Sequence, residues 1–321
     1  MTRLQPLLEY SENFGFRGAP LSRPVYPLAG IAIYLLVITG LERVMRTRRP
    51  FSLRSAVVLH NVFLTLLSLA MGFGTLIEIM LHAVREPDGL RAIACDHRGT
   101  VMRGRLLFWM YVFYVSKYYE LLDTIIMVLR KRPLSFLHVY HHCVVLPLFW
   151  MYLRTSMVIH FILVVANSFV HVFMYYYYAV SALGYRVWWK QHLTMAQIVQ
   201  FVIDLTATYP FVYFYFRHPK GCSGSMRAFI FGQLVGISFC YLFWDFFRKS
   251  YRTPKQSRSR EKEAALSSEP TSEAQQFVKS THFSADAGDQ TTSAAKAGML
   301  ASTARGSVTG TRRHTSARRL S

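Results

Sequence analysis

Long apolar runs separated by short polar segments fill the chain between Arg23 and Lys249. A helix that crosses a bilayer needs roughly 20 mostly apolar residues. Seven stretches meet this requirement, at about 26–45, 56–82, 105–129, 134–153, 156–182, 195–216 and 228–248. The first begins too late and runs too long for a cleavable signal peptide, so it is also predicted to be a span. The pattern therefore predicts an all-α membrane protein with seven transmembrane helices.

The apolar pattern stops after Lys249, where Ser, Thr, Ala, Arg, Lys and Glu dominate. Residues 250–321 have too few apolar side chains to form a core, which predicts a disordered tail. The chain thus divides into an N-terminal segment at 1–25, a membrane domain at 26–249 and the tail.

Composition and charge favour the same class of protein. Of the 321 residues, 52% are hydrophobic and 17% are charged, against roughly 25% charged in a soluble domain. The formal net charge is +20, and +14 of it belongs to residues 1–249, where Lys and Arg stand between the apolar runs. A nucleic-acid-binding protein would spread these residues over a soluble fold. We therefore expect a lipid bilayer as the partner of this chain, and no nucleic acid.

The basic loops predict an orientation. Clusters of Lys and Arg at 46–54, 130–132 and 248–252 fall on one side of the predicted spans, and the positive-inside rule makes that side cytosolic. The loop at 83–104 carries four arginines on the other side, but three acidic residues accompany them. The N-terminal segment is therefore predicted to be non-cytosolic and the C-terminus cytosolic.

The four cysteines fit this orientation. Cys143 and Cys240 lie inside spans and are expected to be free core residues. Cys95 and Cys222 lie in the two loops on the non-cytosolic side, where disulfides persist. We predict that these two are bridged; the alternative is a pair of unrelated thiols.

Polar residues inside spans are costly, which makes each one a functional candidate. Lys117, Glu120 and Thr124 share one face of the third span, with Asp123 beside them. This set could instead be an ion pair between Lys117 and Glu120 that holds helices together and leaves the second carboxylate unpaired. In the fourth span, the three imidazoles lie within about 100° of one face; they are His138, His141 and His142.

Two more spans carry polar stripes. The fifth has one stripe with Asn167, His171, Met174, Tyr175 and Tyr178, although the tyrosine run could also be an interfacial belt. The sixth presents Thr194, Gln197, Gln200 and Asp204 on one face, where the glutamines could merely join helices. At a rise of 1.5 Å per residue, His141 lies roughly 12 Å from the cytosolic end of its helix. The corresponding distance is roughly 15 to 20 Å for four other residues, which are Gln200, Glu120, Lys117 and His171. A common depth predicts one buried polar site open to the cytosol.

Three kinds of protein could use such a site. A di-iron oxygenase would need roughly eight histidines together with carboxylates, more than this depth supplies, so we predict no metal site. A receptor or transporter would not need three histidines beside Lys, Glu and Asp. An enzyme acting on an acyl-CoA could use a histidine nucleophile and an apolar tunnel. Phosphates would meet the basic residues at the mouth, which are Arg130, Lys131, Arg132, Lys190 and His192, although the positive-inside rule alone also explains them.

Four ordered motifs identify a family. They are Lys117-x-x-Glu120-x-x-Asp123-Thr124, His138-x-x-His141-His142, His171-x-x-Met174-Tyr175-x-Tyr177-Tyr178 and Thr194-x-x-Gln197-x-x-Gln200. On these motifs, the chain resembles, over about residues 26–250, the ELO family of very-long-chain fatty acid elongases, which are the 3-oxoacyl-CoA synthases of the endoplasmic reticulum. The resemblance implies that spans two to seven form a barrel around an acyl tunnel closed at the luminal end. It also implies a link between Cys95 and Cys222.

The resemblance further implies an acyltransferase that condenses a long-chain acyl-CoA with malonyl-CoA to give 3-oxoacyl-CoA, CO2 and CoA. Malonyl-CoA would be a co-substrate, with no cofactor, and the reductases and dehydratase of the elongation cycle would be partners. His141 would accept the acyl group, with His171 opposite and His138 and His142 orienting groups or moving protons. The substrate-binding residues would be Lys117, Glu120, Asp123, Asn167, Tyr175, Lys190, Gln197 and Gln200. Among these, Lys117, Asn167 and Gln197 are expected to stabilise an enolate, and the two acids to neutralise Lys117 or set a histidine tautomer.

Overall fold

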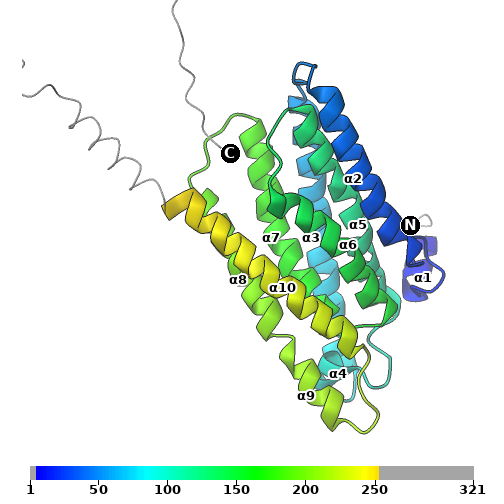
Figure 1. Cartoon of the computed structure of the whole chain (residues 1–321). Coiled ribbons are helices and arrows are strands. Elements are labelled where there is room, and N and C mark those ends of the chain that lie inside the picture. Colours follow the sequence, from blue (N-terminus) through cyan, green and yellow to red (C-terminus); the bar gives the residue numbers. More distant parts are fainter. Residues whose placement is uncertain (1–4, 253–321) are drawn as a thin grey trace, which may run out of the picture. The chain divides into compact units, whose positions relative to one another are not determined.

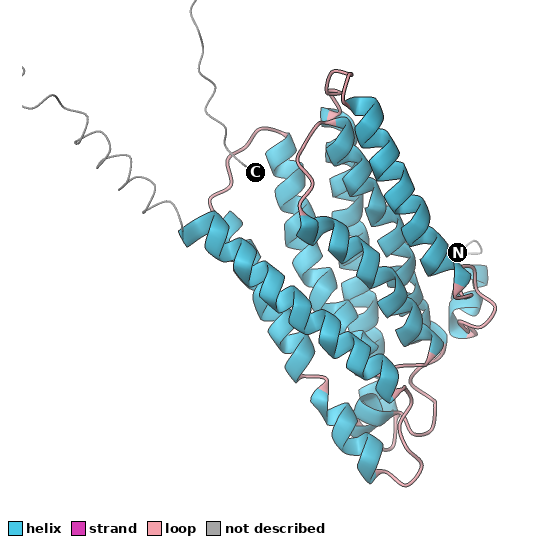
Figure 2. Cartoon of the chain, viewed as in Figure 1, coloured by secondary structure: helices cyan, strands magenta, loops and turns pink. Residues whose placement is uncertain are grey.

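The computed structural model describes residues 5–252, so all but the first three residues of the predicted tail lie outside the described part of the chain. Within residues 5–252 every regular element is a helix (Figure 2). The elements are α1 (Gln5–Glu12), α2 (Val25–Met45), α3 (Arg54–Arg85), α4 (Leu90–Cys95), α5 (Gly104–Leu129), α6 (Phe136–Arg154), α7 (His160–Ala182), α8 (Lys190–Thr206), α9 (Tyr209–Arg217), α10 (Met226–Phe247) and the π-helix η1 (Arg248–Arg252).

Six helical segments of the described chain are long and apolar enough to cross a membrane. They are α2, α3, α6, α7, the segment formed by α8 and α9, and α10 with η1. The chain therefore has the helices of a multi-pass membrane protein. The third predicted span is present as α5, which is 26 residues long but carries Lys117, Glu120 and Asp123. A seventh crossing at α5 therefore stays a prediction.

The sixth predicted span, at 195–216, is wrong as a single continuous helix. It begins earlier, at Lys190, and breaks at residues 207–208 between α8 and α9. Pro210 explains the break, because it has no N–H to donate to the carbonyl of Thr206 but fits the first turn of a new helix. The Thr208 hydroxyl donates to the Asp204 carbonyl at 2.8 Å and so provides a partner for one carbonyl in the last turn of α8.

Two other boundaries differ from the sequence pattern. The fourth span begins at Phe136 rather than 134, because the Ser135 hydroxyl caps the helix and accepts a hydrogen bond from the His138 N–H at 3.2 Å. The fifth begins at His160 rather than 156, after a loop in which Ser156 has a φ of 51°. Hydropathy shows neither the Ser135 cap, which is a hydrogen bond, nor the loop before His160, which is itself apolar.

The long helices pack in a consistent order (Figure 1). Successive neighbours are α3, α5, α6, α10, α8 and α7, and α7 packs extensively on α3. Helix α2 lies outside this set, against α5 and α6. A barrel formed by these helices, with a tunnel inside it, stays a prediction.

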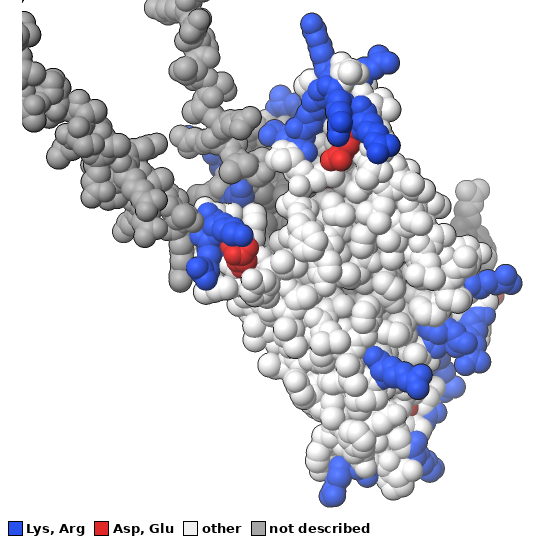
Figure 3. Space-filling model, viewed as in Figure 1, with Lys and Arg blue, Asp and Glu red and all other residues white. Residues whose placement is uncertain are grey.

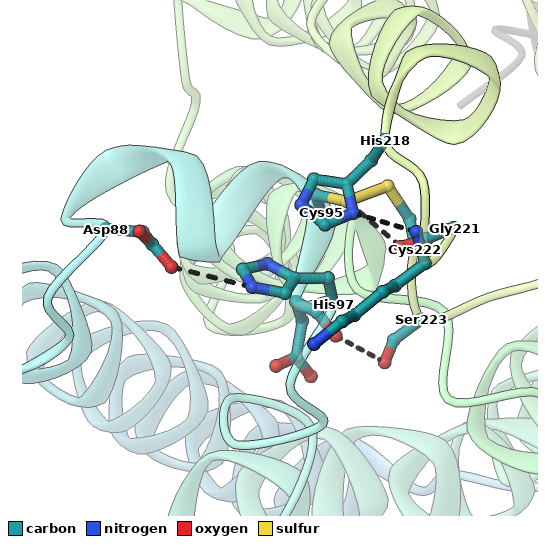
Figure 4. Close-up of a disulfide and its surroundings, with 9 residues drawn as sticks. Asp88, Cys95, His97, His218, Gly221, Cys222 and Ser223 are labelled. Atoms are coloured by element: carbon teal, nitrogen blue, oxygen red, sulfur yellow. Dashed lines mark hydrogen bonds and ion pairs between the residues drawn. A yellow bond between two sulfur atoms is a disulfide. The ribbon is translucent and has the colours of Figure 1, made fainter.

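A disulfide crosslinks two segments at one end of the bundle. Cys95, at the end of α4, is joined to Cys222 in the loop between α9 and α10, which confirms the predicted bridge (Figure 4). The Ser223 hydroxyl adds a hydrogen bond to the Asp96 carbonyl at 2.8 Å. The Asp96 carboxylate in turn accepts three backbone N–H groups, from residues 100–102. We call this the disulfide end; Cys143 and Cys240 are free, as predicted.

The opposite end carries the loops that follow α2 and α5. The Phe51 N–H donates to the Leu129 carbonyl at 3.0 Å, and Lys131 Nζ donates to the Arg46 carbonyl at 3.4 Å. Figure 3 shows Lys and Arg gathered at this end and again toward the disulfide end, with a broad face between them that has almost no charge. A pale band between two charged ends is the surface expected of a protein in a bilayer.

A close contact between α6 and α10 provides a test of this packing. A Cβ added at Gly232 would overlap the hydroxyl of Tyr152 and lie 2.8 Å from its Cζ atom, and the Tyr152 side chain is only 2% exposed. Gly232→Ala should therefore lower the free energy of unfolding by about 1–3 kcal/mol. The measurement is the thermal unfolding midpoint of the full chain in detergent.

Gly40→Ala is the matched control, because a Cβ at Gly40 meets nothing within 4 Å. This change should leave the unfolding midpoint the same or raise it, since alanine is the better helix former. Equal midpoints for the two variants would contradict the close approach of α6 to α10.

Candidate active site

A cavity with about 580 Å³ of empty space, part of it open to solvent, lies among α5, α6, α7, α8 and α10. Its lining has two polar parts: one is formed by Lys117, His141, Asn167 and Gln200, and the other by Asp204, Thr208 and Gln233. Helices α6 and α8 both run toward the disulfide end, so their later residues line the cavity on that side, and most of these residues are apolar. The apolar side chains of the wall include Val145, Leu148, Phe149, Leu163, Phe201 and Leu205. The cavity thus combines a polar site around His141 with a mostly apolar wall toward the disulfide end.

Lys117 forms the ion pair with Glu120 that the sequence offered as an alternative to a functional set. Its Nζ atom lies 2.8 Å from Glu120 Oε1 and 3.1 Å from Asn167 Oδ1. The ammonium also lies 4.1 Å from the ring centre of Phe113, within the range of a cation–π contact. An ammonium has three N–H donors, so one remains to face the cavity.

Glu120 also contacts Ser116 and His171. Its Oε1 atom accepts from the Ser116 hydroxyl at 3.2 Å and lies 3.8 Å from His171 Nδ1. His171 therefore contacts the Lys117–Glu120 pair on its Glu120 side, and it is not part of the cavity lining. Its sequence position on the polar stripe of α7 is explained by this contact.

Only one of the three clustered histidines lines the cavity, and it is His141. The Nε2 atom of His138 lies 2.8 Å from the hydroxyl of Thr124, which in turn lies 3.0 Å from the hydroxyl of Tyr34 on α2. His142 is buried between His138, His141 and Tyr34, and its Nδ1 atom has no hydrogen-bond partner among the described residues. Because the three rings spread over an arc of about 100°, they contact different neighbours.

The second carboxylate of α5 is also paired, so the expectation that a Lys117–Glu120 pair would leave it unpaired is wrong. Asp123 lies 2.6 Å from His60 Nε2 on α3 and accepts from the Tyr175 hydroxyl on α7 at 2.9 Å. The sequence pattern gave no role to His60. Helix depth would have found it, since His60 lies six residues from the start of α3 and Asp123 six residues from the end of α5. Both are therefore about 9 Å from the same end of the bundle.

The remaining predicted residues lie at different places. Gln200 lines the cavity and donates from Nε2 to Asp204 Oδ2 at 3.0 Å. Gln197 contacts Met174 Sδ at 3.7 Å, and Lys190 is the first residue of α8; neither lines the cavity. In residues 5–252, His, Cys, Asp and Glu form no group of three that could hold a metal ion.

The cavity therefore brings an imidazole, an ammonium and two amides together at the start of an apolar wall. An imidazole can act as a nucleophile or a base. Ammonium and amide N–H groups can donate to an oxygen on which negative charge develops. This combination suits transfer of a group that has both a reactive carbonyl and a long apolar part.

Known proteins resemble this chain over most of its length. The model of the ELO family, described as the GNS1/SUR4 family, matches residues 19–259. A putative fatty acid elongase from Dictyostelium discoideum is 39% identical over 247 residues, which are 77% of this chain and 83% of that protein. Fatty acid elongase sre1 of the same organism is 35% identical over 79% of this chain and 94% of its own length. Very long chain fatty acid elongase 4 of Mus musculus is 32% identical over 75% of this chain and 76% of its own length. The chain therefore belongs to the ELO family, also called the GNS1/SUR4 family.

Proposed function

We propose that this protein is a fatty acid elongase that condenses a long-chain acyl-CoA with malonyl-CoA, giving a 3-oxoacyl-CoA, CO2 and CoA. Its relatives include proteins named as fatty acid elongases. The observation that carries the proposal is the position of His141, at the junction between the polar part of the cavity and its apolar wall. An acyl chain along that wall would bring its thioester carbonyl to the imidazole.

The first half-reaction transfers the acyl group to the protein. A ring nitrogen of His141 attacks the thioester carbonyl, the carbon–sulfur bond breaks, and CoA leaves as the thiolate. The ring proton is released, and an acyl-imidazole remains. The free N–H of Lys117 and the amide NH2 of Asn167, whose oxygen already accepts from Lys117, can donate to the carbonyl oxygen as it gains negative charge.

The second half-reaction uses malonyl-CoA. Loss of CO2 leaves the two electrons of the broken carbon–carbon bond on the CH2 group as an enolate, which attacks the acyl carbon. The bond to His141 breaks, and the imidazole recovers a proton. Since the same N–H donors can stabilise the enolate oxygen, one polar site serves both steps, and the reaction needs no cofactor beyond the co-substrate.

The other predicted residues act through these groups. Glu120 and His171 hold the Lys117 ammonium in place. Asp123, with His60 and Tyr175, joins α5 to α3 and α7, which fixes the helix that carries Lys117. His138 and His142 would set the position of α6 and exchange protons with the His141 ring as the substrates bind, while Gln197 would support α8 rather than the enolate.

We place the protein in the endoplasmic reticulum membrane with seven spans, α5 included, and a cytosolic C-terminus. The basic end of the bundle would then face the cytosol, where Arg130, Lys131, Arg132 and Lys190 could meet CoA phosphates. The reductases and dehydratase that complete the elongation cycle would act on the released 3-oxoacyl-CoA from the same side.

Replacement of His141 tests the acyl intermediate. His141→Ala should lower elongation of a long-chain acyl-CoA by about 1,000-fold or more, because the nucleophile is lost. When malonyl-CoA is withheld, mass spectrometry of the wild-type protein should find an acyl group on residues 133–154, with fragment ions that assign it to His141. An adduct on His138 or His142 instead, or full activity of a folded His141→Ala protein, would exclude this nucleophile.

A pair of substitutions separates the chemical role of Lys117 from its structural one. Lys117→Met leaves the Glu120 carboxylate buried without its partner and should lower stability by about 3–5 kcal/mol. The double change Lys117→Met with Glu120→Gln removes both charges and should restore the thermal unfolding midpoint, but not the activity. Recovery of elongation by the double variant would show that the ion pair serves only to hold the helices.

A further inference from the structure

A second polar cluster lines the same cavity, on the side toward the disulfide end from His141. It comprises Asp204 of α8, Thr208 in the break between α8 and α9, and Gln233 of α10. Gln233 Nε2 donates to the Thr208 hydroxyl at 2.9 Å, and that hydroxyl donates to the Asp204 carbonyl at 2.8 Å. The elongation chemistry proposed above uses none of these three side chains.

Asp204 is the member of this cluster with unused hydrogen-bonding capacity. Its Oδ2 atom accepts from Gln200, whereas Oδ1 is shielded from solvent and has no hydrogen-bond partner among the described residues. The Oδ2 bond joins two residues one turn apart on α8, and the Gln233–Thr208 bond joins α10 to the break after α8. Neither bond gives Oδ1 a partner. A buried carboxylate oxygen without a partner is costly in either protonation state, so a group that enters the cavity is the natural partner.

The position of Asp204 identifies that group. Along α8, Asp204 lies one turn, about 6 Å, beyond Gln200, with Phe201 and Leu205 beside it on the cavity wall. On α6, the lining continues from His141 to Tyr152, a rise of about 16 Å. An acyl chain bound at His141 and extending along this wall would pass Asp204 with its middle part, well beyond the thioester.

We propose that the cavity selects acyl-CoA substrates that carry a hydroxyl group on the acyl chain, held by Asp204. This inference rests on the proposed elongase function. A hydroxyl suits the site in both states of the carboxyl, because it can donate to a carboxylate oxygen and accept from a carboxylic acid. An unsubstituted chain would leave Oδ1 without a partner, and sites built to bind a substrate hydroxyl discriminate strongly against analogues that lack it.

The test compares matched substrates with the full-length protein in detergent. Each acyl-CoA of a given length is offered with malonyl-CoA, once unsubstituted and once with a hydroxyl at successive positions along the chain. The wild-type protein should favour a hydroxyl at one or two neighbouring positions by about 10- to 100-fold in kcat/KM, as expected of a hydrogen bond to a carboxylate. If every hydroxylated substrate is slower than its unsubstituted match, the inference is wrong while the elongase function stands. If no acyl-CoA is elongated, the elongase function itself fails.

Substitutions then assign the preference to one residue. Asp204→Leu should bring the ratio of kcat/KM values close to one, by slowing the hydroxylated substrate and favouring the unsubstituted one. Asp204→Asn keeps an oxygen acceptor of the same shape and should give an intermediate ratio, which provides a second reading if the leucine variant does not fold. Asp245→Asn removes an exposed carboxylate that pairs with Lys249 near the end of α10 and should leave the ratio as in the wild type. A wild-type ratio in both Asp204 variants would refute the role of this residue.

Discussion

Inside the helix bundle, the Lys117 ammonium lies 2.8 Å from the Glu120 carboxylate, and neither side chain is more than 2% exposed. Removing two charges from water costs several kcal/mol per ion, and their mutual attraction offsets this only when other groups satisfy the remaining donors and acceptors. Here Ser116 and Asn167 supply two such hydrogen bonds and the Phe113 ring lies against the ammonium, whereas Glu120 Oε2 has no hydrogen-bond partner among the described residues. The charged groups are thereby fixed beside the cavity, where the low dielectric strengthens their action on a substrate.

The same helix connects most of the bundle through its polar residues. Between residues 116 and 124, α5 makes side-chain contacts with Tyr34 of α2, His60 of α3, His138 of α6 and Tyr175 of α7. These polar residues distinguish α5 from the six more apolar segments. They also set the distances between the helices that line the cavity. A helix that is poorly suited to lipid contact is well suited to the interior of such a bundle, where its polar side chains meet polar side chains of neighbouring helices.

Hydropathy and helical spacing predicted the helices and the Cys95–Cys222 bridge and offered the Lys117–Glu120 pair as an alternative, because each depends on local pattern or on loop position. The pattern did not show that α8 ends before Pro210, since the surrounding residues are as apolar as those of a continuous span. Nor did it show which clustered histidine lines the cavity, because spacing places three rings on one face without stating which neighbour each ring meets. His60 was overlooked for a different reason: a single histidine carries no pattern, and its partner comes from another helix.

In the proposed mechanism, His141 takes the acyl group before malonyl-CoA reacts. The decisive measurement is the amount of free CoA released from a long-chain acyl-CoA when malonyl-CoA is absent. The wild type should release a burst of about one CoA per protein molecule and then stop, and a folded His141→Ala protein should show no burst. Release of CoA only after malonyl-CoA is added, or an equal burst from both proteins, would contradict the mechanism.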